Sequence, residues 1–181
     1  SAHMMPETPC PRGSPLESCN YPEKDYSLKS PISTDGVPNA PLCHHTTPYS
    51  SPVATYKAGE SIPVKFAEGG ATHGGGHCEF SLSYDGGETF VAIQTILKTC
   101  FTEGLTFSVP IPEDAPSSDK VVFAWSWVNA VGNREFYMTC SDIAIEGKDG
   151  GSISGPPMLH PNYGDGPTIG EFGYGGDDGS D

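Results

Sequence analysis

Two histidines in this chain stand where their imidazole nitrogens could bind a transition metal. His3 lies near the start of the sequence, and His73 is followed by three glycines at positions 74–76. If Ser1 and Ala2 are removed, His3 presents a free α-amino group beside its imidazole, and these two nitrogens can chelate one metal. His73 would complete a planar set of three nitrogens, which suits Cu(II). The glycines permit the close backbone approach that aims a loop histidine at a surface metal.

Two further candidates, Glu135 and Tyr137, lie in the last apolar segment of the chain. They are two residues apart in a predicted strand, so their side chains face the same side of a sheet. We expect Tyr137 near the axial position of the metal, with a phenol too fully protonated to be a strong ligand. A buried tyrosine whose hydroxyl is satisfied by a neighbour is the alternative. Glu135 is either an acid that acts close to the metal or the partner of Arg134 in an ion pair, and both alternatives stay open.

The other histidines are weaker candidates. His77 lies four residues after His73 and is either an alternative ligand or a solvent-facing strand residue. His44 and His45 look like a metal pair, but they are adjacent in a loop rich in Thr, Pro and Ser, and we interpret them as surface residues. His160 falls near the end of the chain, and we expect no role for it.

Alternation of apolar and polar residues begins near Ser61 and predicts half-buried strands. The expected strands span residues 61–66, 78–84, 89–97, 105–109, 121–128 and 135–145. No window shows the 3.6-residue period of an amphipathic helix, and turn residues separate the strands. We therefore expect an all-β fold of two packed antiparallel sheets, with Trp125 and Trp127 in its core.

The two ends of the chain lack this alternation. Residues 6–60 are rich in Pro, Ser, Thr and Asn, and we expect long ordered loops held by cysteines instead of by a sheet. Residues 148–181 are dominated by Gly, Pro and Asp and hold too few apolar side chains to offset their ordering entropy. We expect an extended acidic tail there, although Tyr163, Ile169 and Phe172 could lay part of it against the sheets.

Six cysteines are scattered along the chain without a C-x-x-C pair, which argues against a tetrahedral zinc site. They are Cys10, Cys19, Cys43, Cys78, Cys100 and Cys140. An even number at such spacing predicts three disulfides formed in an oxidising compartment. Fifteen connectivities are possible; Cys78 and Cys100 flank one predicted hairpin, which favours their pairing.

The balance of charge excludes several classes of partner. The formal net charge is −14, so a polyanionic nucleic acid or an anionic membrane surface would be repelled. No stretch approaches the roughly 20 apolar residues that a membrane helix needs. A neutral polymer such as a polysaccharide carries no such penalty. Together with the cysteines, these features predict a secreted protein, and we expect the chain to be its mature form because no signal peptide precedes it.

The arrangement of several short motifs resembles a known family. The motifs are His3-Met4, Pro9, Pro11, Ala71-x-His73-Gly-Gly-Gly-x-Cys78, Trp125-Ser126-Trp127 and Gly132-Asn-Arg-Glu-x-Tyr137-Met138-x-Cys140. In combination they resemble the fungal chitin-active lytic polysaccharide monooxygenases, auxiliary-activity family eleven, over residues 3–147. The sequence departs from that pattern at His77, where the family has a small polar residue, and at the early cysteine, Cys10.

The resemblance implies a fold, a cofactor and a reaction. It implies an immunoglobulin/fibronectin-like sandwich over 3–147, with 148–181 as the tail, and one copper ion in a histidine brace formed by His3 and His73. Tyr137 would be the axial residue, Glu135 the acid behind it, and Ala71 the residue crowding the open axial side. It also implies oxidative cleavage of an insoluble polysaccharide, chitin first, by a monomeric secreted enzyme that takes electrons from an external donor.

Two other functions stay open from the residues alone. The chain could be a non-catalytic homologue that binds copper or a cell-wall glycan, or a structural wall protein without a metal if His3 is internal. Ser1-Ala2 fits the small-residue end of a signal peptide, whereas Ser-Ala-His-Met also fits a cloning junction. The sequence does not decide whether Ser1 or His3 is the mature N-terminus.

Overall fold

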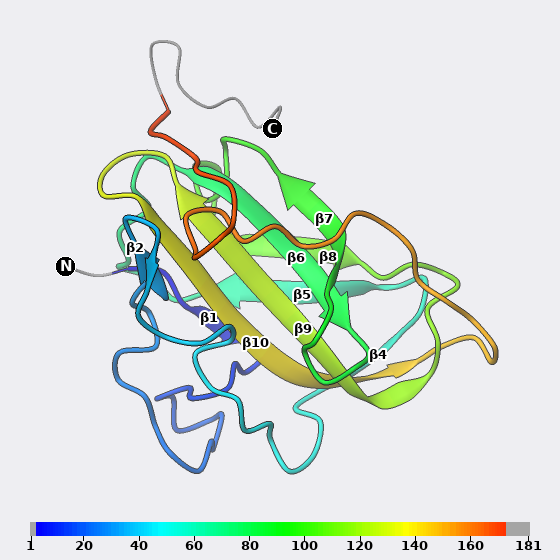
Figure 1. Ribbon diagram of the computed structural model, residues 1–181. Coiled ribbons are helices and arrows are strands. Elements are labelled where there is room, and N and C mark those ends of the chain that lie inside the picture. Colours follow the sequence, from blue (N-terminus) through cyan, green and yellow to red (C-terminus); the bar gives the residue numbers. More distant parts are fainter. Residues whose placement is uncertain (1–2, 173–181) are drawn as a thin grey trace.

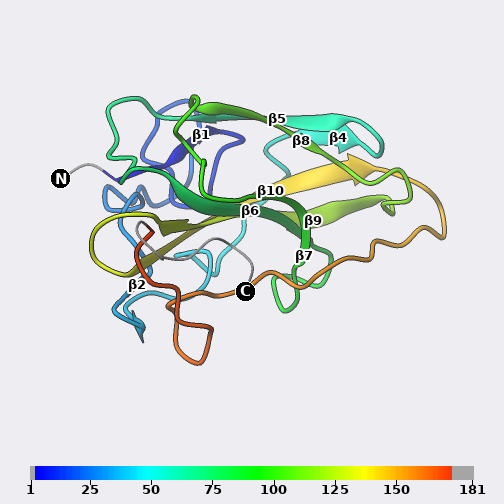
Figure 2. The same ribbon diagram turned by 90° about the horizontal axis from the view of Figure 1, so that it is seen from above.

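The alternating segments of the sequence form two stacked β-sheets (Figures 1 and 2). The computed structural model describes residues 3–172, so the expectations for Ser1 and for residues 173–181 of the tail lie outside the described residues. One sheet has three strands in the order β1 (Pro6–Thr8), β5 (Ser61–Phe66) and β8 (Thr106–Pro110). Within residues 3–172 no helix is long and apolar enough to cross a membrane.

The larger sheet carries most of the structure. Its strands, in spatial order, are β3 (Val37–Pro38), β2 (Ser33–Thr34), β10 (Glu135–Glu146), β9 (Ser118–Asn129), β6 (Gly76–Ser83) and β7 (Val91–Ile96). A further strand, β4 (Thr55–Lys57), pairs in parallel with the end of β10. All the other pairings are antiparallel. The prediction of an all-β, disulfide-linked sandwich of packed antiparallel sheets is confirmed.

The prediction that residues 6–60 contain no sheet ladder was wrong. Four short strands, β1 to β4, lie in this segment: β1 pairs with β5, β2 and β4 pair with β10, and β3 pairs with β2. Each is only two or three residues long. Such strands are too short to show a period of two, so the sequence pattern could not reveal them.

Alternate side chains of β9 point between the two sheets and form the core. Phe123, Trp125 and Trp127 are at most 3% exposed, and Phe66 of the opposite sheet packs edge-on against Trp125 with 5.0 Å between ring centroids. Fully burying one large apolar side chain stabilises a fold by about 1.5–3 kcal/mol. The tryptophans are therefore core residues, as predicted.

The outer face of the larger sheet is buried as well. Its apolar cluster combines Val122, Ala124, Phe136, Met138 and Cys140 with Ile32, Cys43, Phe90 and Met158 from the flanking segments. Because β9 is covered on both faces, the sequence 121–128 is an almost uninterrupted apolar run instead of a clean alternation.

Residues 148–172 form a C-terminal strap that covers part of this outer face. The strap runs beneath the larger sheet, on the side away from the three-stranded sheet (Figure 2). Pro157 bridges to Val91 of β7, and Met158 and Ile169 are 6% and 7% exposed. A few well-spaced apolar side chains are thus enough to order a segment whose composition is that of an extended tail.

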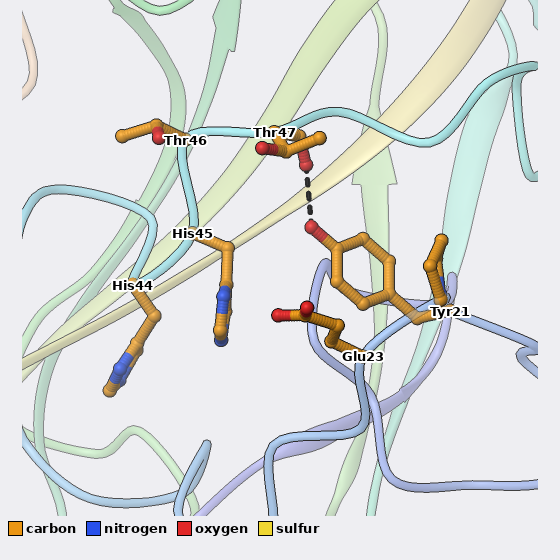
Figure 3. Close-up of a pocket in the computed structure, with 7 residues that line it drawn as sticks. Tyr21, Glu23, His44, His45, Thr46 and Thr47 are labelled. Carbon is orange, nitrogen blue, oxygen red and sulfur yellow. Dashed lines mark hydrogen bonds between the residues drawn. The ribbon is translucent and has the colours of Figure 1, made fainter.

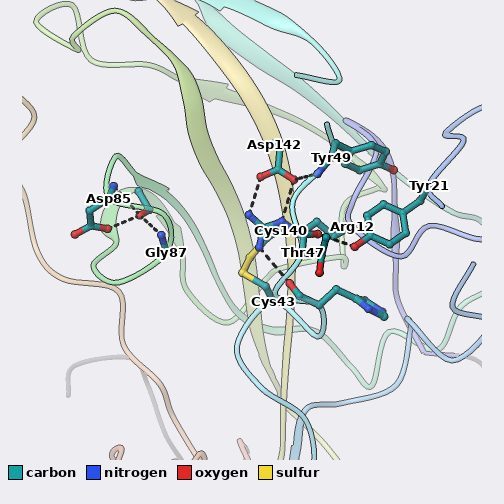
Figure 4. A network of polar contacts seen from close by, with 11 residues as sticks. Arg12, Tyr21, Cys43, Thr47, Tyr49, Asp85, Gly87, Cys140 and Asp142 are labelled. Atoms are coloured by element: carbon teal, nitrogen blue, oxygen red, sulfur yellow. Dashed lines mark hydrogen bonds and ion pairs between the residues drawn. A yellow bond between two sulfur atoms is a disulfide. The ribbon is translucent and has the colours of Figure 1, made fainter. Parts of the chain in front are cut away.

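The N-terminal loops are joined to β10 by a disulfide and a buried ion pair (Figure 4). Arg12 donates two hydrogen bonds to the carboxylate of Asp142, at 2.9 and 2.7 Å, and Cys43 is bonded to Cys140. The Tyr49 amide donates to the same carboxylate at 2.9 Å. A bidentate guanidinium–carboxylate pair is among the strongest polar contacts in proteins, so this network positions the long loops against the sheet.

The three disulfides should differ in what they contribute to stability. They join Cys10 to Cys19, Cys43 to Cys140 and Cys78 to Cys100, with sequence separations of 9, 97 and 22 residues. Closing a longer loop removes more entropy from the unfolded chain. We expect Cys43→Ala/Cys140→Ala to lower the free energy of unfolding by roughly 2 kcal/mol more than Cys10→Ala/Cys19→Ala. Denaturant titration of both variants measures this, and equal losses would contradict it.

Candidate metal centre

His3 enters the centre from the chain just before β1, and its backbone is firmly held. The next residue, Met4, is 1% exposed in the core. Gly70 lies so close that a Cβ there would stand 2.5 Å from the carbonyl oxygen of His3. A larger residue at position 70 would therefore push the His3 backbone away.

His73 lies in the tight turn that leads into β6. Its backbone φ is +49°, a region that residues other than glycine seldom adopt. The amide of Val131 donates a hydrogen bond of 3.0 Å to the carbonyl oxygen of His73, and the amide of Gly75 donates one of 2.9 Å to Thr72. The ring of His73 lies 5.8 Å from that of the buried Trp127. A non-glycine residue persists in this conformation only where its surroundings hold it, and these contacts do so.

The two imidazole rings present nitrogens toward each other. His73 Nε2 lies 3.4 Å from His3 Nδ1, and the ligand atoms of His3, His73 and Glu135 all lie within 4.8 Å of one another. An imidazole nitrogen binds a divalent metal at about 2 Å, so two ligands of one ion lie at most about 4 Å apart. The separation of the histidine nitrogens fits a shared ion, and the nitrogen donors suit copper or zinc.

Tyr137 lies between His3 and Glu135 and links the two side chains. Its hydroxyl donates to Glu135 Oε1 at 3.0 Å and lies 2.8 Å from His3 Nδ1. Because a hydroxyl has one proton, the second contact requires that His3 carry its proton on Nδ1. A metal at Nδ1 would release that proton.

Burial and charge set the protonation states in this cluster. Tyr137 is 1% exposed, and desolvation, followed by the charge of Glu135, raises the pKa of its phenol far above the usual range. The phenol therefore keeps its proton. Burial lowers the pKa of His3, while Glu135 opposes this shift and the neighbouring His73 adds to it. A neutral His3 is the form that can act as a ligand.

Ala71 and His77 lie on either side of the turn that carries His73, and Ala71 is half-buried. The Lys98 amide donates a hydrogen bond to His77 Nδ1 at 3.0 Å, and the ring of Phe172 lies 4.3 Å from that of His77. His77 is not among the grouped ligand atoms, which are those of His3, His73 and Glu135 in the part of the chain that the structure describes.

His44 and His45 line a separate pocket of about 370 Å³ in the N-terminal loops (Figure 3). His45 Nε2 pairs with Asp25 at 2.7 Å, and His44 Nε2 lies 3.0 Å from the carbonyl oxygen of Ser30. These contacts explain both rings without a metal. The ring of His160 packs between Phe136 of β10 and Tyr163 of the strap.

Asn129 was missed in the sequence although it shapes the centre. It is fully buried, its Nδ2 donates to the carbonyl oxygens of Val131 and Asn133 at 2.9 Å each, and its Oδ1 accepts from the Glu135 amide at 3.4 Å. One side chain thus bonds three backbone groups of the β9–β10 turn. Asn129 follows the apolar run 121–128 and lies three residues before Gly132, and a polar turn-forming residue at that place was the available signal.

The chain resembles known proteins in sequence. No family model matches the chain. It is 40% identical over 154 residues to "AA11 family lytic polysaccharide monooxygenase A" of Aspergillus fumigatus, covering 83% of this chain and 68% of that protein. It is 31% identical over 162 residues to an AA11 family lytic polysaccharide monooxygenase of Aspergillus oryzae, of which it covers 36%.

Two solved structures share the fold at low sequence identity. They are the crystal structure of HiLPMO9B, with a TM-score of 0.53, 13% identity and coverage of 70% of this chain and 66% of that one, and a cellulose-active polysaccharide monooxygenase from M. thermophila, with a TM-score of 0.52, 17% identity and coverage of 67% and 64%. At such identity the likeness concerns the sandwich alone.

The charge of Glu135 can be tested through the titration of His3. Because a nearby carboxylate favours the protonated imidazole, Glu135→Gln should lower the pKa of His3 further. Nuclear magnetic resonance titration of the metal-free protein measures this. His160 is the internal control, since burial alone lowers its pKa. An unchanged or raised pKa of His3 would show that the carboxylate does not act on this ring.

Proposed function

The chain belongs to the AA11 family of lytic polysaccharide monooxygenases, and we propose that His3 and His73 hold the single copper ion with which it works. The observation that carries this proposal is the 3.4 Å approach of His3 Nδ1 to His73 Nε2. Copper binds nitrogen ligands more tightly than the other divalent first-row metals do. Removal of residues 1–2 would expose the α-amino group of His3 as a third nitrogen donor.

The neighbouring side chains have distinct roles in this proposal. When bound, copper supplies the redox chemistry that lets an oxidant attack a C–H bond beside a glycosidic linkage. Tyr137 keeps its proton and therefore adds no strong anionic ligand on its side of the centre. The buried carboxylate of Glu135 accepts a hydrogen bond from the Tyr137 hydroxyl. In this position it can accept or return a proton. As the family resemblance implies, Ala71 would crowd the open side of the centre.

The substrate that we propose is an insoluble neutral polysaccharide, with chitin first because the motifs of the sequence resemble those of chitin-active enzymes. The net charge of −14 would repel polyanionic polymers but carries no penalty toward a neutral one. Electrons would come from an external donor. The three disulfides favour an oxidising compartment, and we propose that the protein is secreted and works as a monomer.

The role of the His3 amino group can be tested by electron paramagnetic resonance. Cu(II) is added to the protein that carries Ser1-Ala2 and to a form that starts at His3. We expect an axial copper signal with nitrogen couplings from the form that starts at His3, because only there is the amino group free to bind. A weak, heterogeneous copper signal from both forms would contradict the proposed centre.

A substitution at His73 tests whether the same centre catalyses the reaction. His73→Ala removes one of the two imidazole donors and should abolish release of oxidised oligosaccharides from chitin in the presence of peroxide and a reductant. His160→Ala is the matched control, since His160 packs in the strap and should leave product release unchanged. Oxidised products from a copper-loaded His73→Ala protein in wild-type amounts would overturn the assignment.

A further inference from the structure

The loop that joins β9 to β10, residues 130–134, carries the backbone against which His73 rests. The Val131 amide donates to the carbonyl oxygen of His73 at 3.0 Å, and the Ala130 amide donates to that of Gly75 at 2.9 Å. A Cβ added at Gly132 would stand 3.7 Å from His73 Nδ1. The β9–β10 loop therefore contacts the backbone of His73 and passes beside its ring.

This loop is also the segment that leads into Glu135, so a shift of the loop would move both sides of the centre. From within, the buried side chain of Asn129 holds the carbonyl oxygens of Val131 and Asn133. Loops that connect neighbouring strands are normally the most mobile parts of a sheet. If Asn129 alone held this loop, the outer side of the loop would be open to water.

The outer side of the loop is held by the C-terminal strap, and Arg134 makes the connection. Its Nε and Nη2 donate to the carbonyl oxygen of Gly132, at 3.2 and 3.1 Å. Its Nη1 donates to those of Ile169 and Gly170, at 3.4 and 3.0 Å. One guanidinium thus bonds the loop and the strap at once. Burial lowers the pKa of Arg134, which accords with a charge partly enclosed between two segments.

A second contact between strap and loop is independent of Arg134. The amide of Phe172 donates to the carbonyl oxygen of Ala130 at 2.9 Å. The strap is itself anchored, because buried Asn162 both donates to and accepts from the backbone of Ile169, at 3.1 and 2.9 Å. Figure 1 shows the red end of the strap beside the yellow β9–β10 loop.

We propose that Arg134 is a positioning residue for the metal centre: together with the strap it clamps the β9–β10 loop, and the loop keeps His73 in its strained conformation. The inference rests on the proposed function of His3 and His73. The physical reason is that the φ of +49° at His73 persists only where the surroundings hold it. The strap is then a working part of the centre, even though it comes after the last strand.

The choice of arginine follows from its geometry. A planar guanidinium donates in several directions at once and can reach three carbonyl oxygens, whereas the single ammonium group of lysine is a compact point charge on a flexible stem. Arg134→Lys should keep the charge but lose part of the bridge. Arg134→Gln should lose the charge and most of the bridge.

The first test needs no metal. Hydrogen exchange is measured at the amides of Ala130 and Val131 in the metal-free full chain. Exchange should be faster in Arg134→Gln than in the wild type and intermediate in Arg134→Lys, with the amides of the β5–β8 ladder unchanged. Lys148→Gln is the matched control, because it breaks an exposed ion pair with Asp114 at the other end of the strap. Unchanged exchange in both Arg134 variants would overturn the clamp.

The second test measures the metal centre itself. We expect Arg134→Gln to weaken Cu(II) binding by about 10-fold, the lower end of what the loss of outer contacts around metal ligands costs, and to broaden the copper resonance signal. In Arg134→Lys we expect a Cu(II) affinity and a copper signal between those of Arg134→Gln and of the wild type. If the wild type shows no nitrogen-coupled copper signal, the proposed function fails while the exchange data still test the clamp. A normal wild-type signal that neither variant alters would overturn the positioning role.

A pair of variants in the strap covers the case in which Arg134→Gln does not fold. Phe172→Pro removes the amide that donates to Ala130, and Phe172→Ala keeps that amide while removing the same aromatic ring. We expect faster exchange at the β9–β10 loop and weaker Cu(II) binding in Phe172→Pro than in Phe172→Ala. Equal behaviour of the two variants, at the level of the wild type, would overturn the part assigned to the strap.

Discussion

The antiparallel pairing of β9 with β10 is the interaction on which the rest of the structure depends. The register runs from Phe136 opposite Val128 to Ile145 opposite Ser118. It sets Trp127 directly opposite Tyr137, with 4.6 Å between their ring centroids. A slip of one residue would turn every side chain to the other face and would take Tyr137 away from His3. Such a slip is costly because both faces of β9 and β10 are buried and every side chain would have to pack among new neighbours.

Polar groups are buried at the end of this ladder, and each is satisfied by a specific neighbour. Glu135 accepts from the hydroxyl of Tyr137, and Asn129 satisfies the turn between the strands. A buried polar group without a partner costs about 1–3 kcal/mol, so this cluster is stable only as a complete set.

The strands with several alternating residues could be predicted from the sequence because period-two burial leaves a clear trace. The prediction of a strand at residues 61–66 is an example, because its alternate side chains are buried and β5 spans Ser61–Phe66. The family was also recognised from short motifs, and the comparisons confirm it. The short strands among residues 6–60 and the packing of the strap left no such trace, since each depends on a few contacts between segments far apart in the chain.

For the proposed metal centre, the residue types, together with the resemblance of the motifs to a known family, singled out His3, His73, Glu135 and Tyr137 as candidates. Only the tertiary structure decided that His3 Nδ1 and His73 Nε2 approach each other and that Tyr137 lies between His3 and Glu135. It also decided that Arg134 turns away to the carbonyl oxygens of the loop and the strap. Distances between side chains that are 70 or 134 residues apart depend on the packing of the two sheets, which no local pattern encodes.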